Sequence, residues 1–96
     1  MSGTSWDQLA EGWDDRREVH TFAVRSYAQL LERGEGVVDW SEARVLEVGC
    51  GTGVLSARVA ALCGELVVVD ASRVMLQYAA QKFENAQNSH VTVIEG

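Results

Sequence analysis

The run from Val45 to Gly53 constrains the fold of this chain more than any other segment. It reads Val-Leu-Glu-Val-Gly-Cys-Gly-Thr-Gly, a short apolar stretch that passes directly into a cluster of glycines. An apolar stretch of this length is typical of a strand buried in a parallel sheet, and the glycines indicate a tight turn into a helix. We therefore expect a strand that begins near Ala43 and opens a βαβ unit.

The residues after this turn continue the alternation of elements. Val54–Cys63 carries an apolar stripe at helical spacing and stops at Gly64, where the helix is expected to end. The apolar run Leu66–Val69 then predicts a second strand, which ends in Asp70.

A second helix is expected next, because Ser72 can cap its N-terminus and the apolar pattern continues to about Glu84. Its predicted inward positions are Met75, Ala79 and Phe83. In the run Val91–Ile94 the polar Thr92 stands between apolar residues, an alternation that predicts a third strand. The sequence thus predicts an α/β fold, in which a βαβαβ unit forms half of a doubly wound, mainly parallel sheet.

Residues 1–42 are expected to form an N-terminal helical segment and a connector, ahead of a sheet-forming domain at 43–96. The helical pattern breaks near Asp14 or Asp15 and stops at Gly34. One face of the expected helix is apolar: Val19, Phe22, Ala23, Tyr27, Leu30 and Leu31.

Net charge, cysteine spacing and the distribution of apolar residues limit the classes of partner and the cellular location that we expect. The formal net charge is -6, which would repel phosphate backbones, so no nucleic-acid partner is indicated. Cys50 and Cys63 are too far apart for a CxxC pair and lack a histidine cluster, so no metal site is predicted. The polar start and the lack of a long apolar run favour a cytoplasmic protein without a membrane partner.

The candidate site lies where the first two strands end, because ligands of such sheets bind beyond the carboxyl ends of the strands. Asp70, at the tip of the second strand, can accept hydrogen bonds from both hydroxyls of a ribose held over the first turn. Glu47 is placed to meet the polar or cationic end of the same ligand. We assign no catalytic residue.

Two motifs give the chain a resemblance to class I, Rossmann-like S-adenosylmethionine-dependent methyltransferases. Residues 45–53 resemble the first motif of that family, and Val67–Ser72, followed by Met75, is similar to the second. The pairs Trp6-Asp7 and Trp13-Asp14 resemble the aromatic and acidic lead-in of the family more weakly.

This resemblance implies S-adenosylmethionine as the cofactor. It implies that the glycine turn passes under the methionine and ribose parts, that Asp70 holds the ribose hydroxyls, and that residues after Asp70 border the adenine. The cofactor-binding residues so predicted are Glu47, Gly49, Cys50, Gly51, Thr52, Gly53, Asp70, Ala71, Ser72 and Met75.

The resemblance also implies that the family's later strands, which select the substrate, lie outside these residues. We therefore expect a truncated cofactor-binding half that is inactive alone and serves methyl transfer to a small-molecule acceptor. The first strand is central in the family's sheet, so its edge would be exposed here and open to self-association.

Other interpretations stay open. A non-enzymatic interaction module could retain the half-fold, and an oxidoreductase fragment could bind a dinucleotide, although Val54 stands where the third glycine of G-x-G-x-x-G would fall. Cys50 is interpreted as a small residue in a tight turn rather than a nucleophile. Arg16 and Arg17 are assigned to a solvated face, and Trp13 to packing more than to a lid.

Overall fold

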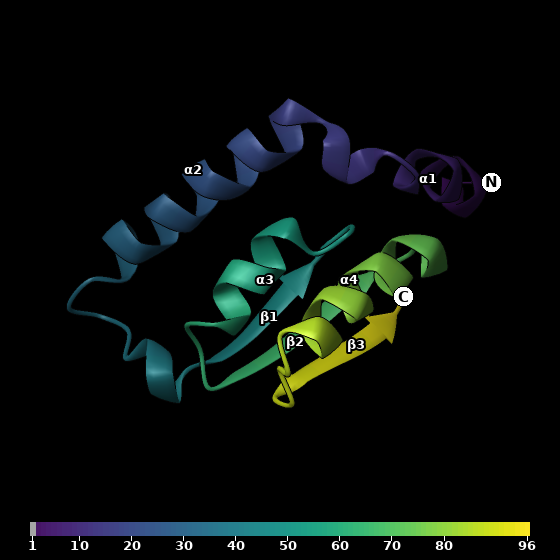
Figure 1. Cartoon of the computed structure of the whole chain (residues 1–96). Helices are drawn as coiled ribbons and strands as arrows, with labels where there is room; N and C mark the ends of the chain where they lie inside the picture. The colour runs from purple at the N-terminus through teal and green to yellow at the C-terminus, as the bar shows by residue number, and fades with distance from the viewer. Residues whose placement is uncertain (1) are drawn as a thin grey trace.

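The computed structural model of the chain describes residues 2–96, with side chains described from residue 6 onward. Three parallel strands form one sheet in the order β1-β2-β3. They are β1 (Arg44–Val48), β2 (Glu65–Asp70) and β3 (Val91–Glu95). The connecting helices α3 (Val54–Ala60) and α4 (Arg73–Asn85) lie on the same face of the sheet (Figure 1). The predicted α/β class and the βαβαβ order are confirmed.

Helix α3 ends earlier than predicted, at Ala60 instead of Cys63. The chain has to turn there, because the N–H of Gly64 donates to the carbonyl of Ala43 at 3.0 Å just before β2 begins. An added Cβ on Gly64 would lie 2.7 Å from the carbonyl oxygen of Ser41, so the turn passes close to the connector before β1.

Helix α4 begins as predicted, with Ser72 as its N-cap. The Ser72 hydroxyl accepts a hydrogen bond from the N–H of Met75 at 3.1 Å, which satisfies a donor that the first turn of a helix leaves free. Met75, Ala79 and Phe83 are all buried, as their helical spacing predicted.

The N-terminal segment folds as α1 (Ser2–Ala10), the short 3-10 helix η1 (Trp13–Asp15) and α2 (Arg17–Gly34), followed by η2 (Trp40–Glu42). The predicted break near Asp14 or Asp15 is confirmed. α2 packs against α3, and α1 packs against α4 (Figure 1). Figure 1 also places α1 at the end of the molecule toward which the strands run, close to the predicted site.

The apolar face predicted for α2 is buried only in part. Ala23 is buried and Tyr27 packs against the core, whereas the side chain of Phe22 is 67% exposed. Leu30 and Leu31 are also exposed. Because α2 lies on α3 and not across the sheet, it has only a narrow strip of apolar surface to contact.

The hydrophobic core lies between the sheet and helices α3 and α4. Leu66 and Val68 of β2 point into it and are fully buried. On the opposite face of the sheet, Leu46 and Val48 of β1 are 64% and 76% exposed. Within residues 2–96, β1 pairs only with β2 and forms one edge of the sheet.

Among residues 2–96, no helix combines the length and the apolar content required to span a bilayer.

Gly53 offers a test of how closely α4 packs against the glycine turn. Gly53 has a φ of +83°, and an added Cβ would lie 3.0 Å from the Cβ of Ala79, whereas Gly36 at φ +74° has open space around it. Gly53→Ala should therefore lower the free energy of unfolding by about 1–3 kcal/mol more than Gly36→Ala. Both variants place an alanine in the left-handed region, but only the new Cβ at position 53 is forced against Ala79. Urea denaturation measures the difference, and equal losses would contradict the close packing.

Candidate functional site

The glycine turn lies at the carboxyl edge of the sheet, between β1 and α3. The carbonyl of Val69 in β2 accepts hydrogen bonds from the N–H groups of Gly49, at 2.7 Å, and Cys50, at 3.2 Å. The turn is therefore tied to the end of the neighbouring strand. Asp70 follows Val69 directly, so the end of β2 supplies both this carbonyl and a carboxylate.

Asp70 holds the site together with both of its carboxylate oxygens. Oδ2 accepts a hydrogen bond from the N–H of Gly51 at 2.8 Å, and Oδ1 accepts one from the N–H of Ser72 at 2.9 Å. The carboxylate thus links the glycine turn to the start of α4. A carboxylate oxygen can accept more than one hydrogen bond, so these two bonds leave capacity for ligand hydroxyls.

A cavity of about 390 Å³ opens beside Asp70. Its lining includes three predicted site residues from the second motif, namely Asp70, Ala71 and Met75. Ser72 does not line it, because its buried hydroxyl donates to the carboxylate of Asp7 and accepts from Met75. The remaining lining residues are Trp6, Trp13, Val48, Gly49, Gly51 and Gly96.

A second cavity, of about 300 Å³, lies on the other side of the glycine turn, between the turn and α2. Gly49, Gly51 and Trp13 border both cavities, so the two meet across the turn. The second cavity contains Glu47, Cys50 and Thr52 from the predicted set. Its other lining residues are Arg16, Glu18, Val19, Phe22, Ala23, Val54 and Leu55.

Glu47 is the partly buried acidic group of this second cavity, and Glu18, which also lines it, is exposed. Glu47 lies on the helix-covered face of β1, where the hydroxyl of Ser56 donates to its Oε1 at 2.6 Å. Burial raises the pKa of the Glu47 carboxyl above its ordinary value, and the Ser56 hydrogen bond opposes that shift. A cationic group placed in the cavity would relieve this penalty by favouring the charged carboxylate.

Cys50, Thr52 and Gly53 have mainly structural surroundings. Burial, together with the nearby charges of Asp70 and Glu47, raises the pKa of the Cys50 thiol to about 12, so the thiol stays protonated at neutral pH. This supports a packing role over a nucleophilic one. Thr52 is buried, with its hydroxyl donating to Asp14, and Gly53 packs against Ala79 instead of lining a cavity.

The N-terminal segment contributes more to the site than its sequence indicated. Trp6 and Trp13 pack edge to face with ring centroids 6.1 Å apart, and Trp13 separates the two cavities. Arg16 was assigned to a solvated face. It is exposed, but its guanidinium lies 5.0 Å from the centre of the Trp13 ring and borders the second cavity. The repeated Trp-Asp pairs were the only signal for this contribution.

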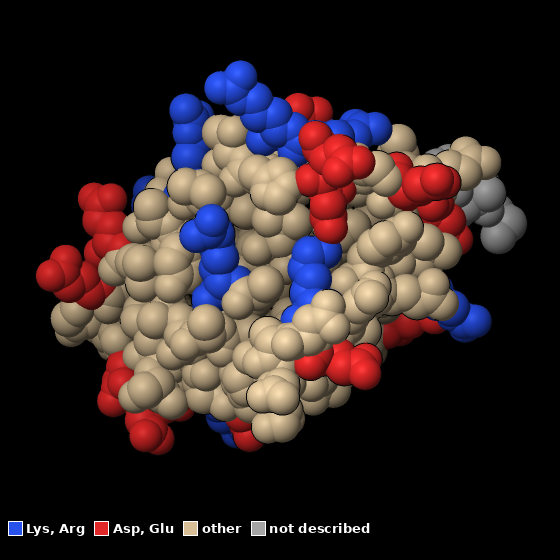
Figure 2. Space-filling model, viewed as in Figure 1, with Lys and Arg blue, Asp and Glu red and all other residues tan. Residues whose placement is uncertain are grey.

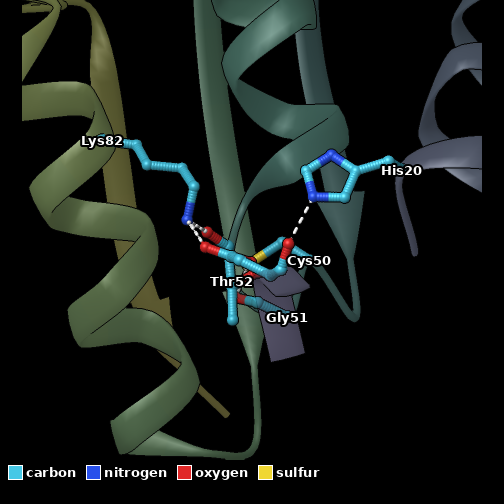
Figure 3. Close-up of polar contacts among 6 residues, drawn as sticks. His20, Cys50, Gly51, Thr52 and Lys82 are labelled. Atoms are coloured by element: carbon cyan, nitrogen blue, oxygen red, sulfur yellow. Dashed lines mark hydrogen bonds and ion pairs between the residues drawn. The ribbon is translucent and has the colours of Figure 1, made fainter. Parts of the chain in front are cut away.

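Lys82 is a site neighbour that sequence reasoning missed entirely. Figure 3 shows it reaching from α4 toward Thr52, while His20 of α2 lies on the other side of the turn. The Nζ of Lys82 donates to the carbonyl of Thr52 at 2.8 Å and forms an ion pair with Asp14 Oδ2 at 2.6 Å. A lone lysine on a helical surface carries no sequence pattern that could have identified it.

Comparison with known proteins agrees with this geometry. A family model described as a methyltransferase domain matches residues 45–96. No curated protein matches the sequence at a significant level.

Solved structures with the same fold include DhpI and several methyltransferases. DhpI in complex with SAH has 19% identity and a TM-score of 0.71, over 97% of this chain and 42% of that one. A SAM-dependent methyltransferase from Aquifex aeolicus has 19% identity and a TM-score of 0.70, over 94% and 46%.

Magnesium protoporphyrin IX methyltransferase from Synechocystis PCC 6803, with bound SAM, has 23% identity and a TM-score of 0.66, over 80% and 36%. The chain thus spans less than half the length of these three proteins. At these identities the structural likeness shows the Rossmann-like fold alone.

Glu47→Gln tests whether the partly buried carboxylate opposes folding. Because burial raises the pKa of Glu47 above its ordinary 4.5, wild-type stability falls as the pH rises from that value through the raised one. Gln keeps the acceptor for Ser56 without the charge. The variant should therefore be more stable than wild type by on the order of 1 kcal/mol at about pH 7, with the gap closing below about pH 4.

Urea denaturation across this pH range makes the measurement. The matched control is Glu65→Gln, which alters an exposed ion pair with Arg44 and should change stability by no more than about 0.5 kcal/mol. A Glu47→Gln variant that is less stable than wild type at neutral pH would show that the charged carboxylate is net favourable in the fold.

Proposed function

Since the chain belongs to the methyltransferase domain family, we propose that it is the cofactor-binding portion of an S-adenosylmethionine-dependent methyltransferase. The observation that carries this proposal is the position of Asp70, whose carboxylate is anchored by two backbone N–H groups beside one of two cavities that meet at the glycine turn. A long ligand with a ribose near its middle suits this arrangement.

The cavity beside Asp70 fits the adenosine part of that cofactor. Asp70 provides acceptors for the ribose hydroxyls, while Met75 and Ala71 provide an apolar surface for the adenine. Trp6 and Trp13 border the same cavity and would exclude water from the base. The absence of a side chain at Gly49 and Gly51 lets a ligand approach the backbone between the cavities.

The cavity under α2 fits the amino-acid part of the cofactor. An α-amino acid carries an ammonium and a carboxylate, and this cavity is lined by the carboxylates of Glu47 and Glu18 and by the guanidinium of Arg16. Pairing with the ammonium would also offset the penalty of burying Glu47. We infer that Glu47 receives the ammonium and Arg16 the carboxylate.

The contribution of these residues to methyl transfer is to bind, orient and exclude water. When bound, S-adenosylmethionine supplies a methyl group on a positively charged sulfur, which is an electrophile for a nucleophilic acceptor. Glu47, Asp70 and Arg16 would hold the two ends of that ligand and so fix its middle at the glycine turn. Such positioning accounts for a large part of the rate gain when two reactants must meet in one orientation. We assign no catalytic base.

The acceptor, the partners and the location belong to the same proposal. We infer a small-molecule acceptor, because on the face drawn in Figure 2 basic and acidic side chains are scattered among uncharged ones and the basic ones form no continuous surface. A nucleic acid would favour a continuous basic surface. Two free, buried cysteines suit a reducing cytoplasm. The exposed edge at β1 is where self-association is expected.

Isothermal titration of the chain with S-adenosylmethionine tests the proposal, with NAD as the competing ligand and circular dichroism to confirm folding. We expect saturable binding of the first ligand and none of the second. Asp70→Ala should weaken binding by on the order of 1–3 kcal/mol, since it removes a charged hydrogen-bond partner. Asp39→Ala is the matched control, because the exposed carboxylate of Asp39 accepts a hydrogen bond from Ser41 in the connector before β1, away from the glycine turn.

Two outcomes would overturn the proposal in different ways. Binding of NAD alone would support the dinucleotide-binding alternative. A folded chain that binds neither ligand would support the interaction module.

Arg16→Met tests the assignment of the amino-acid end. The variant should bind S-adenosylmethionine about tenfold more weakly. Its affinity for 5′-methylthioadenosine, which lacks the amino-acid part, should equal that of wild type. Arg17→Met is the matched control, since Arg17 is the adjacent arginine and lines neither of the two site cavities. If Arg16→Met weakened the binding of both ligands equally, Arg16 would instead contact the adenosine part or stabilise the fold.

A further inference from the structure

Three side chains from distant parts of the sequence meet beside the glycine turn. Asp14 comes from η1, Thr52 from the turn and Lys82 from α4. The carboxylate of Asp14 uses both oxygens, one accepting from the Thr52 hydroxyl and the other from Lys82 Nζ at 2.6 Å. Lys82 also donates to the carbonyl of Thr52 at 2.8 Å (Figure 3). Each member of the group therefore bonds the other two.

This group differs from the other ion pairs of the described chain. The side chains of Lys82 and Asp14 are 29% and 35% exposed, against 85% and 62% for Arg44 and Glu65. Partial burial reduces the screening of the ion pair by water. Desolvation raises the pKa of the Asp14 carboxyl, but the hydrogen bonds from Lys82 and Thr52 lower it more, so this pKa lies below its ordinary value. Removal of Lys82 would leave a partly buried carboxylate and a turn carbonyl short of a donor.

The segment held by this group is attached mainly by polar contacts. Within residues 6–15 only Ala10 is buried, so little apolar surface secures this stretch. Further polar ties are the bond from Ser72 to Asp7 and the contact between His20 Nε2 and the carbonyl of Asp14 at 2.5 Å. The packing of α1 against α4 and the position of Arg16 over the Trp13 ring add to them. Segments with few buried apolar contacts open locally at a small fraction of the global unfolding free energy.

The same segment carries the aromatic wall of the site. Trp13 borders both cavities and precedes Asp14 directly, so a movement of η1 away from the turn would carry Trp13 with it. Lys82 lines neither of the two cavities, and it therefore acts on the site only through Asp14 and the turn.

We propose that Asp14, Thr52 and Lys82 form a latch that keeps η1 and Trp13 closed over the glycine turn, and that Lys82 is thereby a positioning residue which sets how long a ligand stays bound. Opening of the latch uncovers both cavities at once. The part concerning ligand residence rests on the proposed function, whereas the closed state of the segment does not.

Hydrogen exchange of the ligand-free chain tests the latch itself. Lys82→Met should speed exchange of the amides in residues 7–16 about tenfold and leave those of the buried strand β2 at the wild-type rate. Asp14→Asn should have a similar effect, and the double variant should exchange no faster than Lys82→Met alone, because both changes remove one interaction. Arg44→Met, which breaks the exposed pair with Glu65, is the matched control.

Unchanged exchange in residues 7–16 of both single variants would overturn the latch. Faster exchange throughout β2 in Lys82→Met would show that Lys82 supports the whole fold, and additive effects in the double variant would show that the two residues act separately. Each of these results contradicts the proposal.

Ligand kinetics then test the positioning role. Stopped-flow tryptophan fluorescence with S-adenosylmethionine should show dissociation about tenfold faster from Lys82→Met, with a smaller change in the association rate. Unchanged dissociation from a variant with an opened segment would overturn the role of Lys82 in ligand residence. If wild type gives no binding signal while exchange responds as expected, the cofactor proposal and this positioning role fail and the latch stands.

Discussion

The structure of the site depends on the carboxylate of Asp70. It accepts hydrogen bonds from the N–H of Gly51 and the N–H of Ser72, which belong to the turns that follow β1 and β2. A charged acceptor makes such bonds stronger than neutral ones, and the two bonds align the glycine turn with the start of α4. The cavities on either side of the turn keep their shape because this one side chain fixes their shared wall.

Around this fixed centre, the N-terminal segment closes the site by a different kind of interaction. The core between the sheet and α3 and α4 is apolar, whereas η1 is held by Asp14, Thr52 and Lys82. Apolar burial makes the centre rigid and the polar contacts leave the cover able to open. A binding site for a ligand enclosed on several sides needs both properties, since the ligand must enter before it can be held.

Sequence reasoning reached the fold and much of the site because these depend on local patterns. The apolar runs and glycines placed β1, β2 and β3 correctly, and Ser72 was recognised as an N-cap from residue type and position. The roles of the predicted site residues stay predictions, although the structure brings Glu47, Gly51 and Asp70 to one edge of the sheet. Phe22 shows a limit of pattern alone, because helical spacing identifies a face without saying what covers it.

The sequence by itself determined the order of the elements, the parallel sheet and the edge of the sheet at which Glu47, the glycine turn and Asp70 gather, because strand and helix periods and turn glycines act between near neighbours. Only the tertiary structure decided that Asp14 and Lys82 meet beside Thr52, that Trp13 stands between two cavities, and that Arg16 borders one of them. Asp14 and Lys82 are 68 residues apart, and their contact depends on how α1 and α2 pack against α4 and α3. Such contacts follow from packing in three dimensions, which no local pattern encodes.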